Sequence, residues 1–262
     1  LNMTFVGAPG TAKTSMARDV GEEYCGLGLL AKPDVFEASR AKLVGEHIGE
    51  TTARTLAFLE SAKGGVALVD EAPELYKPHT PNDFGPEALD TIMKWTEDNR
   101  DSTMVILAGY KEPLNAMLDN HNVGMRSRFP VQLEFPSYNA SEMVEILTRM
   151  AATRSKVLID PAACDYWLRV CTFLYDNWSE DRGQMQAGVA VGPRRLIDIA
   201  ANGRFARMVL TEAALLMKNR VLATLDTSTA DGLRAGRTVI TEDLRQATRR
   251  MLATQGVDPA RS

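Results

Sequence analysis

A candidate phosphate-binding loop spans residues 7–14, with the sequence GAPGTAKT. It follows an apolar run and precedes an amphipathic stretch. In a tight glycine-rich turn of this kind, backbone N–H groups and the positive end of the next helix surround phosphate oxygens. Lys13 would reach the β- and γ-phosphates, and the Thr14 hydroxyl would ligate Mg²⁺. We predict nucleotide contacts from Gly7, Ala8, Pro9, Gly10, Thr11, Ala12, Lys13, Thr14 and Ser15.

The loop departs from the strict pattern GxxxxGK[ST] at one position. Ala12 stands where the pattern has its last glycine. A Cβ atom there is expected to crowd a backbone that must approach phosphate closely. Binding of a nucleotide is therefore predicted with a loop of altered geometry.

A pair of carboxylates, Asp70 and Glu71, ends an apolar run 57 residues beyond Lys13. Asp70 would hold Mg²⁺, directly or through water. Glu71 would orient and deprotonate an attacking water. Loop and acidic pair, in this order and spacing, predict attack of water on the γ-phosphate of a magnesium-bound nucleotide.

Alternating β-type and helical patterns must position these groups. Apolar runs predict strands at residues 2–6, 35–38, 66–70, 103–108 and 131–135. Helical patterns lie between them near residues 13–27, 50–63, 85–99 and 111–119. This alternation predicts an α/β fold with a five-stranded parallel sheet flanked by helices, over residues 1–137. Ligands of such sheets bind at the carboxyl ends of the strands, which is where the loop and the acidic pair fall.

The second half, residues 138–262, is expected to be a small all-helical lid domain. Helical patterns cover residues 141–154, 161–178, 194–223 and 241–253, and residues 179–192 and 226–237 are predicted loops. Ser141 and Asp160 are the expected helix starts. The first half carries 13 basic and 20 acidic side chains, and the second 17 and 14. A basic half suits a lid that touches an anion, but plain variation in surface charge explains it equally well.

Composition limits the class of protein. The chain has 262 residues, 45% hydrophobic and 24% charged, which excludes a collagen-like or wholly disordered protein. A net charge of −4 argues against a nucleic-acid partner. Three cysteines indicate a reducing, cytoplasmic compartment. No apolar run reaches the roughly 18–20 residues of a membrane helix, so no membrane insertion is expected. The chain opens inside a strand without a signal peptide, which predicts a fragment with a truncated amino terminus.

The order of motifs resembles the AAA+ ATPases, and within them the CbbX/CfxQ group. Similar blocks cover nearly all of the first half: residues 7–14, 43–55, 64–75, 83–101, 105–110, 125–129 and 135–145. Two further blocks, residues 25–40 and 196–209, resemble the carboxy-terminal ATPase module of the EccA family of type VII (ESX) secretion. Members of that family carry a helical-repeat domain ahead of this module.

The resemblance implies roles for several side chains beyond the loop. Arg128 matches the arginine finger that reaches a neighbouring subunit's nucleotide, with Arg126 as second choice. Arg204 matches the second-domain arginine that senses bound phosphates, and Arg194 is its rival from spacing alone. Tyr110 falls at the first sensor position, where its phenol would contact phosphate or water, or pack as an ordinary aromatic.

The same resemblance implies partners. His47, Ile48 and Gly49 match a loop that faces the central pore of a ring and grips an extended substrate, although relatives have an aromatic residue where this chain has His47. A solvent-exposed loop histidine is the simpler explanation. The expected assembly is a homo-hexamer that binds ATP and Mg²⁺ and acts on protein substrates, with ESX secretion substrates as the expected clients.

The leading hypothesis is therefore an ATP-hydrolysing AAA+ protein that remodels or delivers proteins for secretion. A Rubisco activase of the CbbX type, or a sporulation-type ATPase, would share its first-half motifs. A different class remains open as well. The departures at Ala12 and Tyr110 also suit a weakly hydrolysing, nucleotide-gated binding scaffold.

Overall fold

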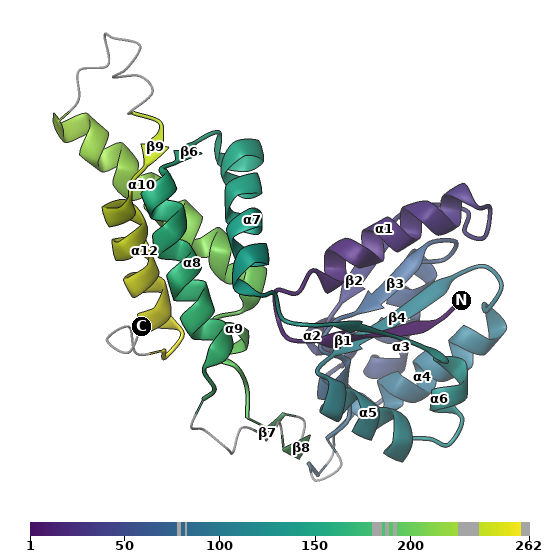
Figure 1. Cartoon of the computed structure of the whole chain (residues 1–262). Helices are drawn as coiled ribbons and strands as arrows, with labels where there is room; N and C mark the ends of the chain where they lie inside the picture. Colours follow the sequence, from purple (N-terminus) through teal and green to yellow (C-terminus); the bar gives the residue numbers. More distant parts are fainter. Residues whose placement is uncertain are drawn as a thin grey trace. The chain divides into compact units, whose positions relative to one another are not determined.

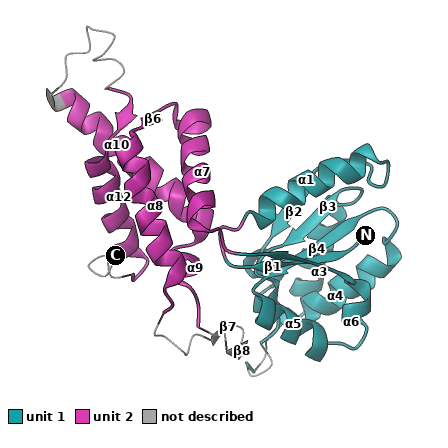
Figure 2. Ribbon diagram, viewed as in Figure 1, with its two compact units in different colours: residues 1–8, 12–136, 181–192 teal, residues 9–11, 137–180, 193–262 magenta. Residues whose placement is uncertain are grey.

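The computed structural model describes residues 1–77, 80–81, 83–179, 185–186, 189–190, 193–224 and 236–257 (Figure 1). The chain forms two compact units (Figure 2). The α/β unit comprises residues 1–8, 12–136 and 181–192, and the helical unit comprises residues 9–11, 137–180 and 193–262. The middle of the phosphate-binding loop, residues 9–11, thus belongs to the helical unit.

A five-stranded parallel sheet forms the centre of the α/β unit, which confirms the predicted fold class. Its strand order is β2-β3-β4-β1-β5. The strands are β1 (Met3–Gly7), β2 (Val35–Ala38), β3 (Val66–Val69), β4 (Met104–Gly109) and β5 (Val131–Phe135). Every residue of β3 and β4 is buried, as expected of central strands covered on both faces.

Helices cover both faces of this sheet (Figure 1). On one face α1 (Lys13–Gly26) packs against alternate strand residues such as Phe5, Leu68 and Ile106. The other residues of the same strands pack against α3 (Glu50–Ser61), α4 (Gly85–Asp98) and α5 (Lys111–Asn120). This division follows from the period of two in a strand, which sends successive side chains to opposite faces.

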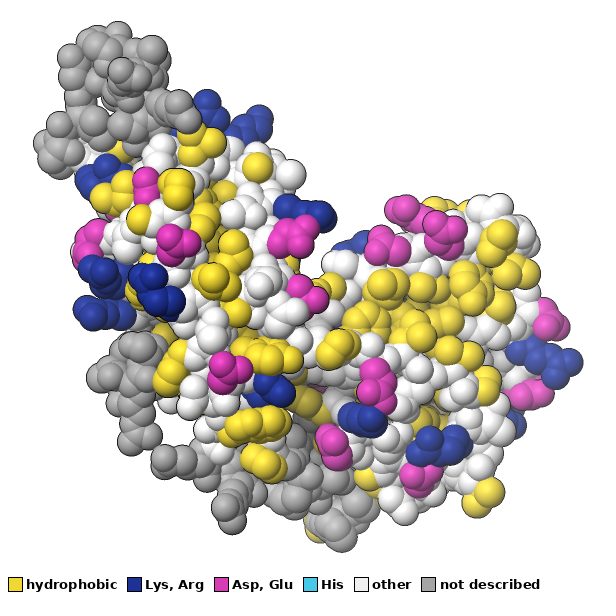
Figure 3. Space-filling model, viewed as in Figure 1, with side chains coloured by type: hydrophobic (Ala, Val, Ile, Leu, Met, Phe, Trp, Pro, Cys, Tyr) yellow, Lys and Arg dark blue, Asp and Glu magenta, His cyan; other side chains and the backbone are white. Residues whose placement is uncertain are grey.

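The β5 edge of the sheet is less completely covered. Val131 is 45% and Leu133 36% exposed. Figure 3 shows hydrophobic side chains gathered in a patch beside α1 on the face in view, with acidic and basic side chains around that patch. Apolar side chains at a sheet edge are typical of surfaces that meet other protein.

Three short elements of the α/β unit escaped prediction from the sequence. They are α2 (Arg40–Leu43), the 3₁₀ turn η1 (Ala72–Leu75) and α6 (Met125–Arg128). Each has four residues, about one helical turn, so no hydrophobic period can be recognised in it.

The helical unit is built from α7 (Ala140–Met150), the π-helical turn η2 (Ala151–Ser155), α8 (Pro161–Asp176), α9 (Leu196–Ile199), α10 (Asn202–Thr224) and α12 (Thr241–Thr254). Two short strands, β6 (Leu158–Ile159) and β9 (Thr238–Val239), pair in parallel. The core is centred on Trp167, which stacks on Phe205 with ring centroids 5.3 Å apart. Both side chains are fully buried.

Helix starts in this unit test the capping predictions. Asp160 is confirmed: its carboxylate accepts the Ala162 N–H at 2.9 Å, and Pro161 opens α8. Ser141 is wrong as a start. The cap of α7 is Asn139, whose side chain accepts the Glu142 N–H at 2.9 Å while the Glu142 carboxylate accepts the Asn139 N–H at 2.8 Å. A reciprocal capping box stabilises this earlier start.

Two other expectations need correction. The single helix predicted over residues 194–223 is divided, because Ala201 (φ 71°), which precedes α10, and Asn202 (φ 48°), its first residue, adopt left-handed conformations. The loop predicted over residues 179–192 contains an antiparallel pair, β7 (Met185–Gln186) and β8 (Val189–Ala190). Most of the other predicted loop, residues 226–235, lies outside the described residues.

Candidate nucleotide site

The phosphate-binding loop has the backbone conformation of an anion-binding nest. Gly10 (φ 76°) and Ala12 (φ 67°) are both left-handed, and right-handed helix begins at Lys13. Such alternation turns successive N–H groups toward one point, where they attract an anion. No side chain caps the amino terminus of α1. The loop therefore presents backbone donors and a helix terminus together, as a phosphate site requires.

Gly10 is required by packing as well as by its conformation. A Cβ atom on Gly10 would lie 2.0 Å from the carbonyl oxygen of Ala201. The Gly203 N–H donates to the Gly10 carbonyl at 3.1 Å, and Asn202 Nδ2 donates to the Pro9 carbonyl at 3.4 Å. Residues 9–11 are thus held by the first turn of α10, within the helical unit.

Asn202 is a functional candidate that the sequence reasoning missed. It is fully buried, and its Oδ1 accepts the Tyr138 N–H at 3.1 Å. Its Nδ2 also donates to Asp198 Oδ1 at 3.0 Å, besides its bond to Pro9. One amide therefore joins Pro9 to Asp198 of α9 and to Tyr138, which precedes α7. The sequence signal for Asn202 is the NGR triplet of residues 202–204, in which Asn202 lies two residues before the predicted sensor Arg204.

Lys13 lies at the base of the loop. Its ammonium group donates to the carbonyls of Gly7 and Ala8, each at 2.8 Å. Thr14 and Ser15 follow in the first turn of α1, half-buried and exposed respectively. The Lys13 ammonium, predicted to meet phosphate, is therefore next to the nest. Thr14, whose hydroxyl is predicted to ligate Mg²⁺, is the next residue of the helix.

The backbone of Ala12 carries a cost that the sequence did not reveal. Its left-handed φ disfavours any residue with a Cβ, whereas glycine adopts it freely. The side chain itself is exposed. Conformational strain, in addition to any crowding of phosphate, therefore distinguishes this loop from one with glycine at residue 12.

Replacing Ala12 with glycine is expected to stabilise the protein. Relief of the left-handed strain should raise the free energy of unfolding by up to about 1 kcal/mol, which corresponds to ~2–4 °C in the melting temperature. Calorimetry checks the shift. Ala57→Gly is a matched control, because Ala57 is exposed in the middle of α3, where glycine should lower stability by about 1 kcal/mol. A fall in melting temperature for both variants would refute the strain at Ala12.

The acidic pair lies at the carboxyl end of β3. The Asp70 N–H donates to the Ala38 carbonyl at 2.8 Å, so Asp70 continues the β2–β3 pairing, and its Oδ1 accepts the Glu71 N–H at 3.0 Å. Glu71 is exposed and left-handed, with φ 53°. A strained non-glycine residue at the tip of a strand is typical of a functional position.

Tyr110 lies at the same carboxyl end of the sheet as the acidic pair. It follows β4 directly and precedes α5. Gly109 pairs with Val6 in the parallel register, which places Tyr110 beside the strand that leads into the loop. The structure thus brings Gly7, Asp70 and Tyr110 to the same carboxyl end of the sheet, as their positions at strand ends predicted. The role of the phenol stays a prediction.

Both candidate finger arginines are paired with carboxylates of their own unit. Arg126 donates to Asp119 at 2.5 Å, and this guanidinium lowers the pKa of the Asp119 carboxyl. Arg128 Nη1 donates to the Gly124 carbonyl at 3.1 Å, and its Nε lies 3.6 Å from Glu97 Oε2. Among the described residues the buried Arg128 Nε has no hydrogen-bond acceptor. Arg128 is thus the less completely satisfied of the two.

Arg204 is exposed in the first turn of α10. Its N–H donates to the Ala201 carbonyl at 3.0 Å, so its backbone belongs to the turn that holds Gly10. Arg194, the rival, precedes α9 and lies outside any helix. Proximity to the loop residues of its own unit favours Arg204 for the phosphate-sensing role, which stays a prediction.

The predicted pore loop is a turn held by hydrogen bonds to Glu50. His47 and Gly49 are exposed, and Ile48 is 92% exposed. Behind them the Glu50 carboxylate accepts the N–H groups of Glu46 (2.9 Å) and His47 (3.3 Å), and pairs with Arg54 at 2.5 Å. Glu50 therefore clamps a turn that presents an apolar side chain to solvent.

The clamp predicts a pH dependence. Hydrogen bonding from the Glu46 N–H, and then from Arg54, lowers the pKa of Glu50 below its ordinary value of 4.5. A lowered folded-state pKa means that the clamp is complete above 4.5 and is lost as the pH falls through the lowered value. We expect the Glu46 and His47 amide resonances to move together in an NMR titration, with a midpoint below 4.5. Glu50→Gln should remove this transition, and a midpoint above 4.5 would contradict the clamp.

The remaining candidate groups form no site in the described part of the chain. No cluster of metal-ligating His, Cys, Asp or Glu side chains is present there. The three cysteines are free thiols, and burial raises the pKa of the Cys171 thiol. Within the same ranges, no helix combines the length and apolar character that crossing a membrane requires.

Comparison with solved structures shows the fold. The chain resembles the crystal structure of the FIGL-1 AAA domain in complex with ADP, with a TM-score of 0.57, 16% identity, and coverage of 95% of this chain and 71% of that one. The FIGL-1 AAA domain solved without a named ligand gives the same TM-score at 18% identity, over 97% and 75% of the two chains.

Comparison with known sequences shows the family. Residues 3–137 match the family described as "ATPase family associated with various cellular activities (AAA)". The ESX-3 secretion system protein EccA3 of Mycolicibacterium smegmatis is 46% identical over 79% of this chain and 32% of its own length. The ESX-1 protein EccA1 of Mycobacterium tuberculosis is 35% identical over 88% and 38%. The chain thus spans about a third of the length of these relatives. It belongs to the AAA family of ATPases and is similar to the EccA proteins of ESX secretion systems.

Proposed function

We propose that this chain is the ATP-hydrolysing module of an EccA-like protein, which couples Mg·ATP hydrolysis to the remodelling or delivery of proteins for ESX secretion. The observation that carries the proposal is the nest in the loop at residues 7–14. This loop follows β1 at the carboxyl end of the sheet, which is also where Asp70 and Glu71 follow β3. Identity to EccA3 and EccA1 supports secretion over Rubisco activation or sporulation as the setting.

The residues fit a magnesium-bound triphosphate chemically. The nest and Lys13 supply donors and positive charge for phosphate oxygens, and the Thr14 hydroxyl and Asp70 carboxylate are the hard oxygen ligands that Mg²⁺ prefers. Bound Mg²⁺ would neutralise charge on the phosphates. Glu71, exposed at the strand tip, would orient a water molecule and accept its proton.

The active form in this proposal is a homo-hexamer in the cytoplasm. Arg128 would reach the nucleotide of a neighbouring subunit, and Arg204 would contact phosphate within its own subunit. Residues 47–49 would grip an extended protein substrate, for which an exposed Ile48 on a clamped turn is suitable. Apolar exposure at β5 also supports association with another protein surface.

A binding scaffold with weak hydrolysis is the second candidate. The observation that favours it is the left-handed Ala12. Strain in the nest would weaken the contacts on which positioning of the γ-phosphate depends.

Phosphate release, measured against protein concentration, tests the proposal. If the neighbour supplies the finger, the rate per subunit should rise with concentration and reach a plateau as rings form. The same measurement on a chain of the relatives' full length shows whether assembly needs the additional residues. Tight binding of Mg·ATP without turnover at any concentration, in either chain, would favour the scaffold.

A further inference from the structure

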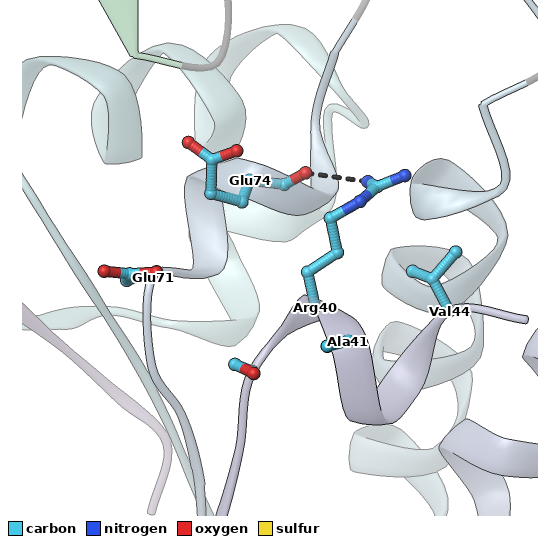
Figure 4. A pocket seen from close by; sticks show the side chains of 6 residues that line it. Arg40, Ala41, Val44, Glu71 and Glu74 are labelled. Atoms are coloured by element: carbon cyan, nitrogen blue, oxygen red, sulfur yellow. Dashed lines mark hydrogen bonds between the residues drawn. The ribbon is translucent and has the colours of Figure 1, made fainter.

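A pocket of about 460 Å³ adjoins Glu71 in the α/β unit. It is lined by Ser39, Arg40, Ala41, Val44, Glu71 and Glu74 (Figure 4). Figure 4 shows the Arg40 side chain extending from α2 to the carbonyl of Glu74, to which its Nη1 donates at 2.7 Å. Arg40 therefore holds η1, the turn that starts directly after Glu71.

The same guanidinium also holds the start of α4. Its Nη2 pairs with Asp83 Oδ1, and its Nη1 lies 3.5 Å from Asp83 Oδ2. The Asp83 side chain is only 3% exposed, and its Oδ1 also accepts the Gly85 N–H at 3.1 Å. A Cβ atom on Gly85 would lie 2.3 Å from the backbone carbonyl oxygen of Leu75 and 2.5 Å from Arg40 Nη1, so glycine is required where η1, Arg40 and α4 meet.

From α4 the hydrogen bonds continue to the base of the exposed turn. Glu87 Oε1 accepts both the hydroxyl and the N–H of Thr52, at 2.5 and 3.2 Å. The neighbouring Thr51 hydroxyl accepts the Gly45 N–H at 2.9 Å, beside the Glu50 clamp. A series of polar contacts thus leads from η1 through Arg40 and Asp83 to the start of α4. From there it passes through Glu87 to the start of α3 and the turn at residues 45–49.

We propose that Arg40 is a positioning residue that couples the Glu71 segment to the turn carrying Ile48. The inference rests on the proposed function and adds the link by which the hydrolytic site and the substrate-gripping turn would respond to each other. Arginine suits this role because its planar fork satisfies a carbonyl and a buried carboxylate at once. A lysine has a single ammonium and cannot reproduce that geometry.

The experiment places an environment-sensitive dye at Ile48→Cys, in full-length protein whose Cys25 and Cys164 are replaced by serine. Dye emission is compared in Mg·ATP and Mg·ADP, beside kcat, KM and nucleotide affinity. Arg40→Gln should bind Mg·ATP within about twofold of the parent, lose most of the emission difference, and lower kcat about tenfold with KM little changed. Arg40→Lys should give an intermediate result. Arg18→Gln, an exposed arginine of α1, is the control and should match the parent.

Glu87→Ala tests the far end of the series without touching the Arg40 pair. It should also reduce the difference in dye emission between Mg·ATP and Mg·ADP. If Arg40→Gln fails to fold, Glu87→Ala alone tests the coupling. An unchanged emission difference in Arg40→Gln, or in a Glu87→Ala protein that binds nucleotide normally, would overturn the coupling. A parent protein that hydrolyses ATP but shows no emission difference would overturn it too. A parent that binds Mg·ATP without hydrolysing it would instead overturn the proposed function.

Discussion

Arg128→Ala is expected to lower the rate of ATP hydrolysis by about a thousandfold or more, with Mg·ATP affinity little changed. An arginine finger places a cation on the γ-phosphate as charge shifts in the transition state, and this stabilisation is worth roughly 10³–10⁵ in rate. Phosphate release at saturating Mg·ATP measures the loss. Arg126→Ala is the matched control, because Arg126 already has a close partner in Asp119. A larger loss for Arg126→Ala would transfer the role to that residue.

Mixed assemblies separate a finger supplied by a neighbour from one that acts within its own subunit. Arg128→Ala subunits retain Glu71, and Glu71→Gln subunits retain Arg128. Hybrid interfaces between them should therefore recover part of the activity, whereas each variant alone is inactive. Equal inactivity at all mixing ratios would exclude action in trans. Because Arg128 Nε lies 3.6 Å from Glu97 Oε2, action in trans would also require Arg128 to leave this pair.

Glu71→Gln is expected to retain Mg·ATP binding and to lower hydrolysis by about 10²–10⁴-fold. The amide has the same shape as the carboxylate but cannot accept the proton of the attacking water. Calorimetric titration with Mg·ATP and a phosphate-release assay together check the separation of binding from turnover. Since Glu71 is exposed, the free energy of unfolding should change by less than about 0.5 kcal/mol.

Glu74→Gln is the matched control for Glu71. Glu74 lies three residues further along, on η1, and its carboxylate pairs with Lys77 at 2.8 Å. Its loss should leave turnover nearly unchanged, because a half-buried surface pair three residues apart contributes little. Turnover that persists in Glu71→Gln but falls in Glu74→Gln would show that the base had been assigned to the wrong carboxylate.

The sheet and its order of motifs were predictable because they depend on local patterns. Runs of apolar residues at 66–69 and 104–109 are long enough to identify buried strands, and parallel topology then brings their carboxyl ends to one edge. The helix start at Asp160 was equally readable, since a cap acts within three residues. Short elements such as α2 and η1 were not, although they build the pocket beside Glu71.

By itself the sequence determined the α/β sheet, the position of the phosphate-binding loop and the placement of Asp70 and Glu71 at a strand tip. The tertiary structure decided the left-handed backbone of Ala12, the hold of α10 on Pro9 and Gly10, and the partners of Arg40. The physical reason is range. Strand and helix patterns follow from neighbours a few residues away, whereas Asn202 meets Pro9 across 193 positions and Arg40 meets Asp83 across 43. Partners so distant in the chain are selected by packing, which no local period records.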